Sequence, residues 1–300
     1  MKKFAKSCFI AALSMLCVGS IILIICTFLG SATLYSYAKD NMPKFNFFDI
    51  DGHITIKNGE AQLDFSDDYP TYSNLDGPLQ IASSEIRNLS LEIAGGKCVI
   101  SESDDEYFHL TTESEHEYQY YVHEETLYIK AFDLSLQIPR DFLFENIDVE
   151  LGIGMIDATS FNAYNNIEIE VGAGEFITHS LSSNTLSIEI GAGNAEIQNA
   201  STKISDFEIG LGNMSYSGII LDNLTAECSM GNLDLLLTDD YKDHNYHVEC
   251  ALGNITLNNN SFGGFVFSKD IQHEAKSTYF LECGMGNMNI LFHQESVRDS

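Results

Sequence analysis

Glutamate residues recur at one fixed place along much of this chain, four residues before a glycine. Seven of them form the main series, Glu150, Glu170, Glu189, Glu208, Glu227, Glu249 and Glu282, and Glu92 occupies the same place in an earlier copy. Some have an acidic neighbour two residues earlier, as in the pairs Asp148 with Glu150 and Glu168 with Glu170. Carboxylate oxygens are ligands for Ca²⁺, and paired carboxylates are the minimal equipment for cleaving glycosides. These residues are therefore candidates for a metal site, a cation-binding surface or an active site.

The glutamates belong to a repeated unit. The segment 167–174, Ile-Glu-Ile-Glu-Val-Gly-Ala-Gly, returns nineteen residues later as Leu-Ser-Ile-Glu-Ile-Gly-Ala-Gly. The last glycine of each copy serves as its reference, and the first five copies of the main series are spaced by 20, 19, 19 and 19 residues. The reference glycines are Gly154, Gly174, Gly193, Gly212, Gly231, Gly253 and Gly286, with the earlier copy at Gly96. A fixed internal period of this length is typical of a solenoid.

Within each unit, apolar and polar residues alternate as in a strand with one buried face. The third residue before the reference glycine is apolar and predicted to point inward: Leu151, Val171, Ile190, Ile209, Cys228, Cys250 or Cys283. The glycine is expected to adopt a backbone angle that a Cβ would forbid. The asparagine that often follows also tolerates the left-handed region, so the pair marks a corner.

One unit cannot bury its own apolar row, but units stacked about 4.8 Å apart form a continuous core. The predicted fold class is all-β: a parallel β-solenoid, or β-helix, with coils of roughly 19–20 residues. One N-terminal transmembrane helix is predicted to precede it.

That helix is predicted over residues 8–30, which contain no charged side chain. At a rise of about 1.5 Å per residue, they span the roughly 30 Å hydrocarbon core of a bilayer. Lys2, Lys3 and Lys6 precede the segment and Asp40 is the first acidic residue after it, so residues 1–7 are predicted to be cytoplasmic. The predicted location is the cell membrane, with a single pass and an extracellular C-terminal domain. A cleaved signal peptide with a small-x-small site at residues 36–38 is the alternative.

The rest of the chain divides by the presence of the repeat. Residues 31–85 show no copy, and we expect a stalk with leading strands around 54–56 and 63–65. The solenoid is predicted over residues 86–292, followed by a polar tail at 293–300. The 58 residues from Gly96 to Gly154 are close to three periods, so two degenerate coils are expected between them. The segment 257–278 is expected to form a protruding loop or hairpin, and the final strand, at 280–292, to cap the stack.

The composition limits the class of partner. The chain has 44 acidic and 15 basic residues, which gives a formal net charge of −29 at pH 7. Such a surface repels nucleic acid and anionic lipid head groups, so nucleic acid is excluded and cations or cationic surfaces are favoured.

The glutamate column has two interpretations. In the first, the exposed side chains splay apart and keep the protein soluble. In the second, the column is a stripe where Ca²⁺ takes oxygens from adjacent coils or where a basic partner lies along the ladder.

An enzyme is the rival from another functional class, because polysaccharide lyases and hydrolases also use parallel β-helices. Carboxylate pairs recur in most coils, however, whereas an active site is local and unlike its neighbours. The only arginines, Arg87, Arg140 and Arg298, lie outside the regular repeats, and the nine histidines are expected at the surface. We predict no catalytic residue and no cofactor other than Ca²⁺, with a carbohydrate-active enzyme as the alternative.

Cysteines occupy the inward column in the last three copies. A free cysteine packs there as a small apolar side chain. Stacked Cα atoms about 4.8 Å apart fall within the range that a disulfide accepts, but parallel Cβ vectors make its geometry poor. Buried thiols are therefore favoured over a disulfide, and a zinc site is disfavoured because the ladder leaves no room for a tetrahedral cage.

The chain also resembles a known family. The segments that carry the resemblance are Leu91-Glu92-Ile93, Leu127-Tyr128-Ile129-Lys130 and Leu136-Gln137-Ile138-Pro139, followed by the successive Gly-x-Gly units. Over about residues 86–292 they are similar to the bacterial "putative adhesin" family with a DUF4097-type β-strand-repeat domain. The resemblance implies a surface-exposed, membrane-anchored solenoid. We expect a binding or structural module whose partner is a cell-surface protein or a glycan.

Overall fold

The computed structural model describes residues 54–57, 60–63, 70–73, 77–112, 118–264 and 266–293. The chain divides into two compact units, Met1–Phe47 and Phe48–Ser300, and every described residue belongs to the second. The predicted cytoplasmic N-terminus, the apolar segment 8–30, most of the stalk and the tail 294–300 lie outside the described residues. Within the described residues, no helix has the length and the apolar character needed to cross a membrane.

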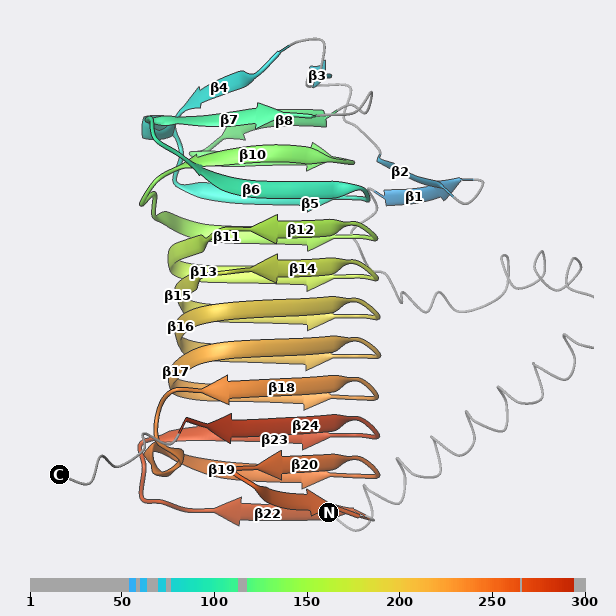
Figure 1. Cartoon of the computed structure of the whole chain (residues 1–300), viewed down its shortest axis with the longest axis vertical. Coiled ribbons are helices and arrows are strands. Elements are labelled where there is room, and N and C mark those ends of the chain that lie inside the picture. The colour runs from blue at the N-terminus through green and yellow to red at the C-terminus, as the bar shows by residue number, and fades with distance from the viewer. Residues whose placement is uncertain are drawn as a thin grey trace, which may run out of the picture. The chain divides into compact units, whose positions relative to one another are not determined.

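The described chain is all-β, as predicted, and its coils stack with their strands parallel (Figure 1). Each coil has two faces. The glutamate face consists of the strands that lead into the glycine corner, and the asparagine face of the strands that follow it.

In spatial order the glutamate face contains β3 (Thr71–Tyr72), β8 (Tyr118–His123), β9 (Thr126–Ala131), β5 (Asn88–Ile93), β11 (Phe144–Leu151), β13 (Phe161–Val171), β15 (Leu181–Ile190), the second parts of β16 (Asn194–Ile209) and β17 (Asn213–Cys228), then β23 (Ser277–Cys283), β19 (His244–Cys250) and β22 (Phe267–Ile271). In the same direction the asparagine face contains β4 (Leu79–Ala82), β7 (Tyr107–Thr111), β10 (Leu134–Pro139), β6 (Lys97–Ser103), β12 (Met155–Ala158), β14 (Glu175–Thr178), the first parts of β16 and β17, then β18 (Asn232–Leu237), β24 (Asn287–Phe292), β20 (Asn254–Leu257) and β21 (Asn260–Gly263).

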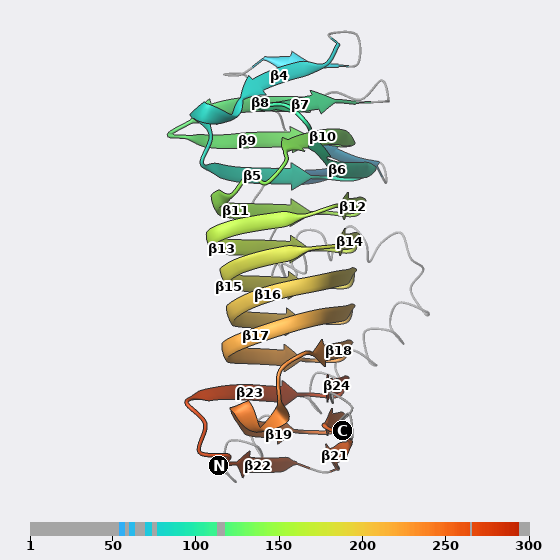
Figure 2. The ribbon, with the colours of Figure 1, turned by 60° about the vertical axis from the view of Figure 1, so that its left-hand side comes forward.

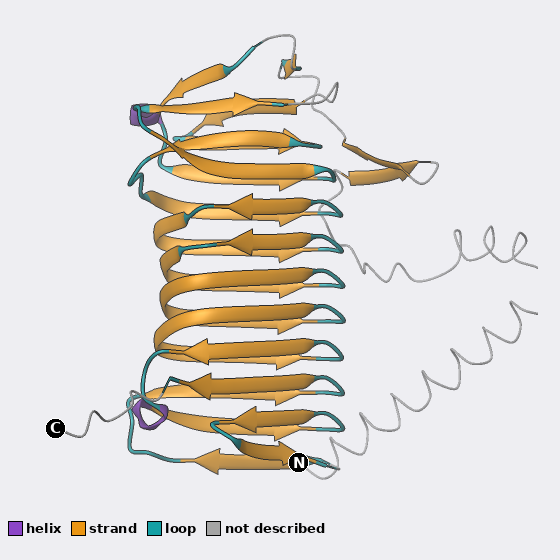
Figure 3. Ribbon diagram, viewed as in Figure 1, coloured by secondary structure: helices purple, strands orange, loops and turns teal. Residues whose placement is uncertain are grey.

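A few short elements lie outside this pattern. β1 (Ile54–Lys57) and β2 (Glu60–Leu63) form a separate antiparallel pair. They correspond to the two leading strands expected around 54–56 and 63–65. Two single-turn 3-10 helices, η2 (Ser83–Glu85) and η3 (Tyr241–Asp243), lie near the two ends of the stack (Figure 3).

Both ends of the stack depart from sequence order (Figure 2). At the N-terminal end, β9–β10 stacks on the outer side of β5–β6, and β7 and β8 lie beyond it in antiparallel pairing. At the C-terminal end, the last coil of the chain, β23–β24, is inserted between β17–β18 and β19–β20. The strands β21 and β22 pair antiparallel with β20 and β19 and cover the outer edge.

The excursion after residue 257 forms the expected hairpin, since β21 pairs antiparallel with β20, but it covers the end of the stack together with β22 instead of protruding. Two other expectations for these ends are wrong. The segment 280–292 does not cap the stack but lies inside it. Along the sequence, the residues from Gly96 to Gly154 form only one coil, β9–β10, together with the reversed strands β7 and β8. The physical reason is that every coil offers the same apolar column and the same backbone edge, so the period alone does not decide which coils become neighbours.

The predicted inward column forms the centre of the core. Its members expose 3% of their surface or less, and their spatial order is Leu151, Val171, Ile190, Ile209, Cys228, Cys283 and Cys250. The three cysteines of this column are buried free thiols. Burial raises the pKa of Cys250 to about 11, so this thiol stays protonated and packs as an apolar side chain.

The reference glycines are needed for a reason that differs from the expected one. Among the eight reference glycines, only Gly96 has a positive φ, of 62°. A Cβ on Gly212 would lie 2.1 Å from the carbonyl oxygen of Gly193, and a Cβ on Gly231 would lie 2.0 Å from that of Gly212. Glycine is therefore required because successive corners approach closely, not because of an unusual backbone angle.

The asparagines that follow the glycines form a hydrogen-bonded ladder. The Asn213 side-chain amide donates to Asn194 Oδ1 at 2.8 Å, Asn232 donates to Asn213 at 2.6 Å, and Asn287 donates to Asn232 at 3.0 Å. None of these residues has a positive φ, so the expected left-handed corner is absent from them. Their amides instead link neighbouring coils, and the ladder extends into the inserted coil at Asn287.

Candidate functional site

Eight glutamates form one unbroken column on the glutamate face. Residue pairing from strand to strand places them in the spatial order Glu92, Glu150, Glu170, Glu189, Glu208, Glu227, Glu282 and Glu249. The order differs from the sequence because β23 carries Glu282 into the space between Glu227 and Glu249. We call these eight residues the glutamate ladder. All seven predicted site residues, and the earlier copy, are thus brought together at a strand spacing of about 4.8 Å.

Both ends of the glutamate ladder are closed by hydrogen-bond donors. Lys130 Nζ lies 2.7 Å from Glu92 Oε2 at one end. At the other end, His247 Nε2 and Ser268 Oγ each lie 3.2 Å from Glu249 Oε1. The pKa of His247 is raised, chiefly by its hydrogen bond to Asp270 at 2.6 Å, which favours the imidazolium form beside Glu249. The anionic stretch is therefore bounded, and its middle has no basic neighbour in the column.

Like charges lie close together along the glutamate ladder, and this affects the pKa values of its members. The pKa of Glu208 is raised first by partial burial and then by the charges of Glu189, Glu227 and Asp206. The pKa of Glu282 is raised first by partial burial and then by its ladder neighbours. In water, two unit charges 4.8 Å apart repel by about 0.9 kcal/mol. A cation placed along the ladder would relieve this repulsion.

A second, shorter acidic row lies two residues earlier on the same strands. Asp148 pairs with Glu168 in the neighbouring coil, and Asp206 follows after Ser187. Desolvation raises the pKa of Asp148, and the charge of Glu168 adds to the shift. Carboxylate pairs are thus repeated over several coils, as the sequence suggests, and they extend the anionic surface sideways.

The geometry does not form a cage for a metal ion. In the part of the chain that the structure describes, no group of three or more His, Cys, Asp or Glu side chains could hold one. Ca²⁺ takes roughly six to eight oxygens around one point, whereas a straight ladder offers its carboxylates in a row. The Ca²⁺ site therefore stays a prediction, and the observed arrangement fits a series of separate contacts with an elongated cationic surface better.

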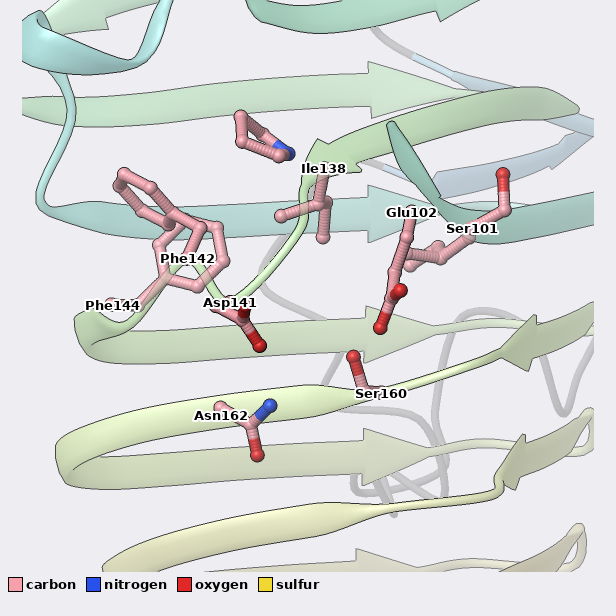
Figure 4. Close-up of a pocket in the computed structure, with 10 residues that line it drawn as sticks. Ser101, Glu102, Ile138, Asp141, Phe142, Phe144, Ser160 and Asn162 are labelled. Atoms are coloured by element: carbon pink, nitrogen blue, oxygen red, sulfur yellow. The ribbon is translucent and has the colours of Figure 1, made fainter. Parts of the chain in front are cut away.

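One pocket contains polar groups of different kinds (Figure 4). It is lined by Ile100, Ser101, Glu102, Ile138, Pro139, Asp141, Phe142, Phe144, Ser160 and Asn162. Glu102 is bound by Arg140 at 3.4 Å, and Arg140 also binds Asp104 at 2.7 Å. Arg140, which lies outside the regular repeats, is thus placed beside one acidic residue of the pocket lining, Glu102. The absence of enzyme activity stays a prediction.

One histidine is not at the surface, contrary to expectation. His244 is 2% exposed and contacts Asp239 through Nε2 and Ser277 Oγ through Nδ1, the latter at 2.7 Å. Ser277 Oγ also donates to the carbonyl of Asp243 at 3.0 Å. Serine, histidine and aspartate are the residue types of a hydrolase triad, but Ser277 is buried as well, so no substrate reaches it. The network instead ties together the two connections that place the inserted coil.

The sequence analysis missed a row of exposed apolar side chains at the glycine corner. We call it the corner ridge, and in spatial order it consists of Ile153, Ala173, Ala192, Leu211, Met230, Met285, Leu252 and Val266. The sequence contains a signal for this row, because the residue directly before the reference glycine is apolar in every copy from Gly154 onward. It was overlooked because strand alternation says nothing of the residue at the corner itself.

A comparison with protein families decides the relationship. The family described as Toastrack DUF4097 matches residues 98–279, more than half of the chain. The chain belongs to this family. The match confirms the resemblance to the DUF4097-type family that the sequence indicates.

Solved structures similar to this Toastrack chain include three bacterial proteins. One is a "putative adhesin" from Bacteroides fragilis, with 9% identity, a TM-score of 0.40, and coverage of 71% of this chain and 96% of that one. Another is a "putative cell adhesion protein" from Clostridium sporogenes, with 13% identity, a TM-score of 0.32, and coverage of 75% and 100%. The third is a "putative adhesin" from Parabacteroides merdae, with 8% identity, a TM-score of 0.33, and coverage of 73% and 96%. No curated protein matches the chain.

Proposed function

We propose that this Toastrack protein is a membrane-anchored, extracellular binding module that acts as an adhesin, and that the glutamate ladder binds a basic partner on a cell-surface protein. The observation that carries the proposal is the continuity of the ladder. The chain inserts its last coil out of sequence, and the insertion still places Glu282 between Glu227 and Glu249. A solubilising surface needs acidic residues, but it does not need one residue type in one register through eight coils.

The charge distribution supports the same proposal. Neighbouring carboxylates repel, and the ladder keeps this repulsion with no basic residue in its middle. A row of lysines or arginines on a partner would offset the repulsion along the whole length and would steer association. The membrane anchor is supported by the uncharged segment 8–30 and the lysines before it.

Binding is tested on intact cells that display the full chain, with fluorescent oligolysine as the probe. The ladder triple variant, Glu170→Gln, Glu189→Gln and Glu208→Gln together, is expected to bind several-fold less. A matched control removes three exposed charges elsewhere, through Glu175→Gln, Asp222→Asn and Asp234→Asn. Equal losses in the two triple variants would contradict a role for the ladder, since oligolysine would then respond to net charge alone.

The topology is tested separately by adding protease to the same cells. Digestion of the solenoid, with the N-terminal fragment retained in the membrane fraction, is the expected result. Intact protein in the culture medium, with an N-terminus at Lys39, would show that the segment 8–30 is a cleaved signal instead.

A further inference from the structure

The corner ridge exposes an unusual amount of apolar surface in one line. Its larger side chains each expose about half of their area: Ile153 51%, Leu211 46%, Met230 50%, Met285 55% and Leu252 53%. Single exposed apolar residues are common on soluble proteins, but contiguous rows of them mark binding surfaces. Each ridge residue lies directly beside the ridge residue of the next coil, so the row is contiguous.

The backbone of the corner does not require these side chains. The amide of Leu211 donates to Gly191 at 2.7 Å, that of Met285 to Ser229 at 2.7 Å, and that of Leu252 to Gly284 at 2.7 Å. Because these amides are already paired, a partner strand cannot add to the corner by backbone hydrogen bonds. Binding at the ridge must therefore use side chains, on a backbone that the stack holds rigid.

The surroundings of the corner ridge differ on its two sides. On one side lies the glutamate ladder, for example Glu208, which is separated from Leu211 only by the inward Ile209 and by Gly210. On the other side lie the residues that follow the corner glycines, where Asn194, Asn213, Asn232 and Asn287 are uncharged and Glu175 is acidic. A partner that covers the ridge therefore meets an apolar row with a continuous anionic row along only one of its flanks.

We infer that the corner ridge and the glutamate ladder together bind a basic amphipathic α-helix of the partner protein. The apolar stripe of this helix covers the ridge and its lysines or arginines face the ladder. The inference rests on the proposed function and names the partner's form. A strand directs neighbouring side chains to opposite faces, so it cannot lay an apolar row and a basic row on one surface, whereas a helix carries such stripes side by side.

Length and charge further define the occupant. From Ile153 to Leu252 the corner ridge crosses six coil steps, which is about 29 Å and matches about 19 residues of helix. A second copy of this chain is a poor occupant, because it carries the same anionic ladder and a net charge of −29.

The test uses the full chain in phosphatidylcholine nanodiscs and two synthetic helices of about 19 residues. One has a leucine stripe flanked by lysines, and the other replaces the leucines with alanines and keeps every lysine. Binding is measured by fluorescence anisotropy, with empty nanodiscs subtracted. The leucine helix is expected to bind the wild type at least about tenfold more tightly than the alanine helix. The ridge variant, Leu211→Ser, Met230→Ser and Met285→Ser together, is expected to lose this preference.

The control variant is Leu236→Ser, which removes an equally exposed apolar side chain away from the corner ridge and is expected to keep the preference. If the triple variant does not fold, as judged by its melting curve, the single substitution Met230→Ser carries the test with a smaller loss. Equal binding of the two helices to the wild type, or an unchanged preference in a folded ridge variant, would overturn the inference. So would a ridge-dependent dimer in sedimentation, because the ridge would then be covered by a second copy.

The ladder triple variant separates this inference from the proposed function. It is expected to weaken both helices and to leave the leucine preference in place. If the ladder triple variant weakens the binding of neither helix while the ridge variant still abolishes the preference, the proposed binding role of the ladder is refuted and the apolar contact at the ridge is supported. If it weakens both helices and the ridge variant changes nothing, the ladder stands and the helix inference has failed.

Discussion

Replacing Glu208 with Gln removes one charge from the middle of the glutamate ladder and is expected to stabilise the protein. Glu208 lies between Glu189 and Glu227 in neighbouring strands, at a spacing of about 4.8 Å. Each neighbour contributes about 0.9 kcal/mol of repulsion in water, and exposed side chains that splay apart reduce the total to about 1 kcal/mol. For a domain of this size, that raises the melting temperature by about 2–4 °C.

The pH dependence has a definite sign. The pKa of Glu208 is raised in the folded state, so between its unfolded and folded values the native protein holds more protons than the unfolded chain. The contribution of Glu208 to stability is therefore full below the unfolded pKa, and it is lost as pH rises through the folded value. The advantage of the Glu208→Gln variant is expected at pH 7 and should vanish toward pH 4.

The assay is thermal unfolding followed by circular dichroism at about 0.01 M and about 1 M salt, where the Debye lengths are about 30 Å and 3 Å. The stabilisation is expected at low salt only. Asp222→Asn, an exposed change outside the ladder, serves as the control for net charge. A Glu208→Gln variant no more stable than Asp222→Asn at low salt, or equally stabilised at both salt concentrations, would refute the reasoning.

Three further predictions concern the corner, the core and the cation. Gly212→Ala is expected to lower the urea midpoint far more than Gly191→Ala, because the new Cβ meets a carbonyl oxygen at 2.1 Å in the first case and at 3.1 Å in the second. Ile190→Asp should cost several kcal/mol by urea unfolding, while Ser187→Asp on the outward side costs little; equal losses would contradict the alternation. Millimolar Ca²⁺ is expected to raise the melting temperature of the wild type but not of the ladder triple variant. If Ca²⁺ does not change the melting temperature of the wild type, the prediction that the ladder binds Ca²⁺ is wrong.

The local rules of the fold are readable from the sequence because they repeat. A polar glutamate between two apolar residues, as at Glu189 beside Ile188 and Ile190, fixes which side chains point inward, and the structure agrees. A requirement for glycine at the corner is also readable, but its cause is not, because a close approach to the next coil depends on a neighbour that the local sequence does not specify. The asparagine ladder was missed for the same reason: its hydrogen bonds join residues of different coils.

The order of the coils could not be predicted, for a different physical reason. Cys228, Cys283 and Cys250 present similar side chains at the same position, so stacking energy alone distinguishes poorly between their possible neighbours. The choice depends on the lengths of the connections and on the buried contacts of His244 with Asp239 and Ser277, which form only after the coil is in place. The corner ridge, in contrast, was visible in the sequence, and a rule for corner residues would have found it.

The insertion of β23–β24 also determines when the protein can finish folding during its synthesis. The coils from β11–β12 to β17–β18 stack in the order in which they leave the ribosome, but the inner side of β19–β20 has no coil beside it until β23–β24 is made. A chain that stops before Ser277 therefore lacks a coil from the inside of the stack and not from its end. It has a gap with open strand edges on both sides, and such edges pair readily with other chains. The β23–β24 coil thus acts as a closing piece, so that the stack becomes continuous only after this coil has been translated.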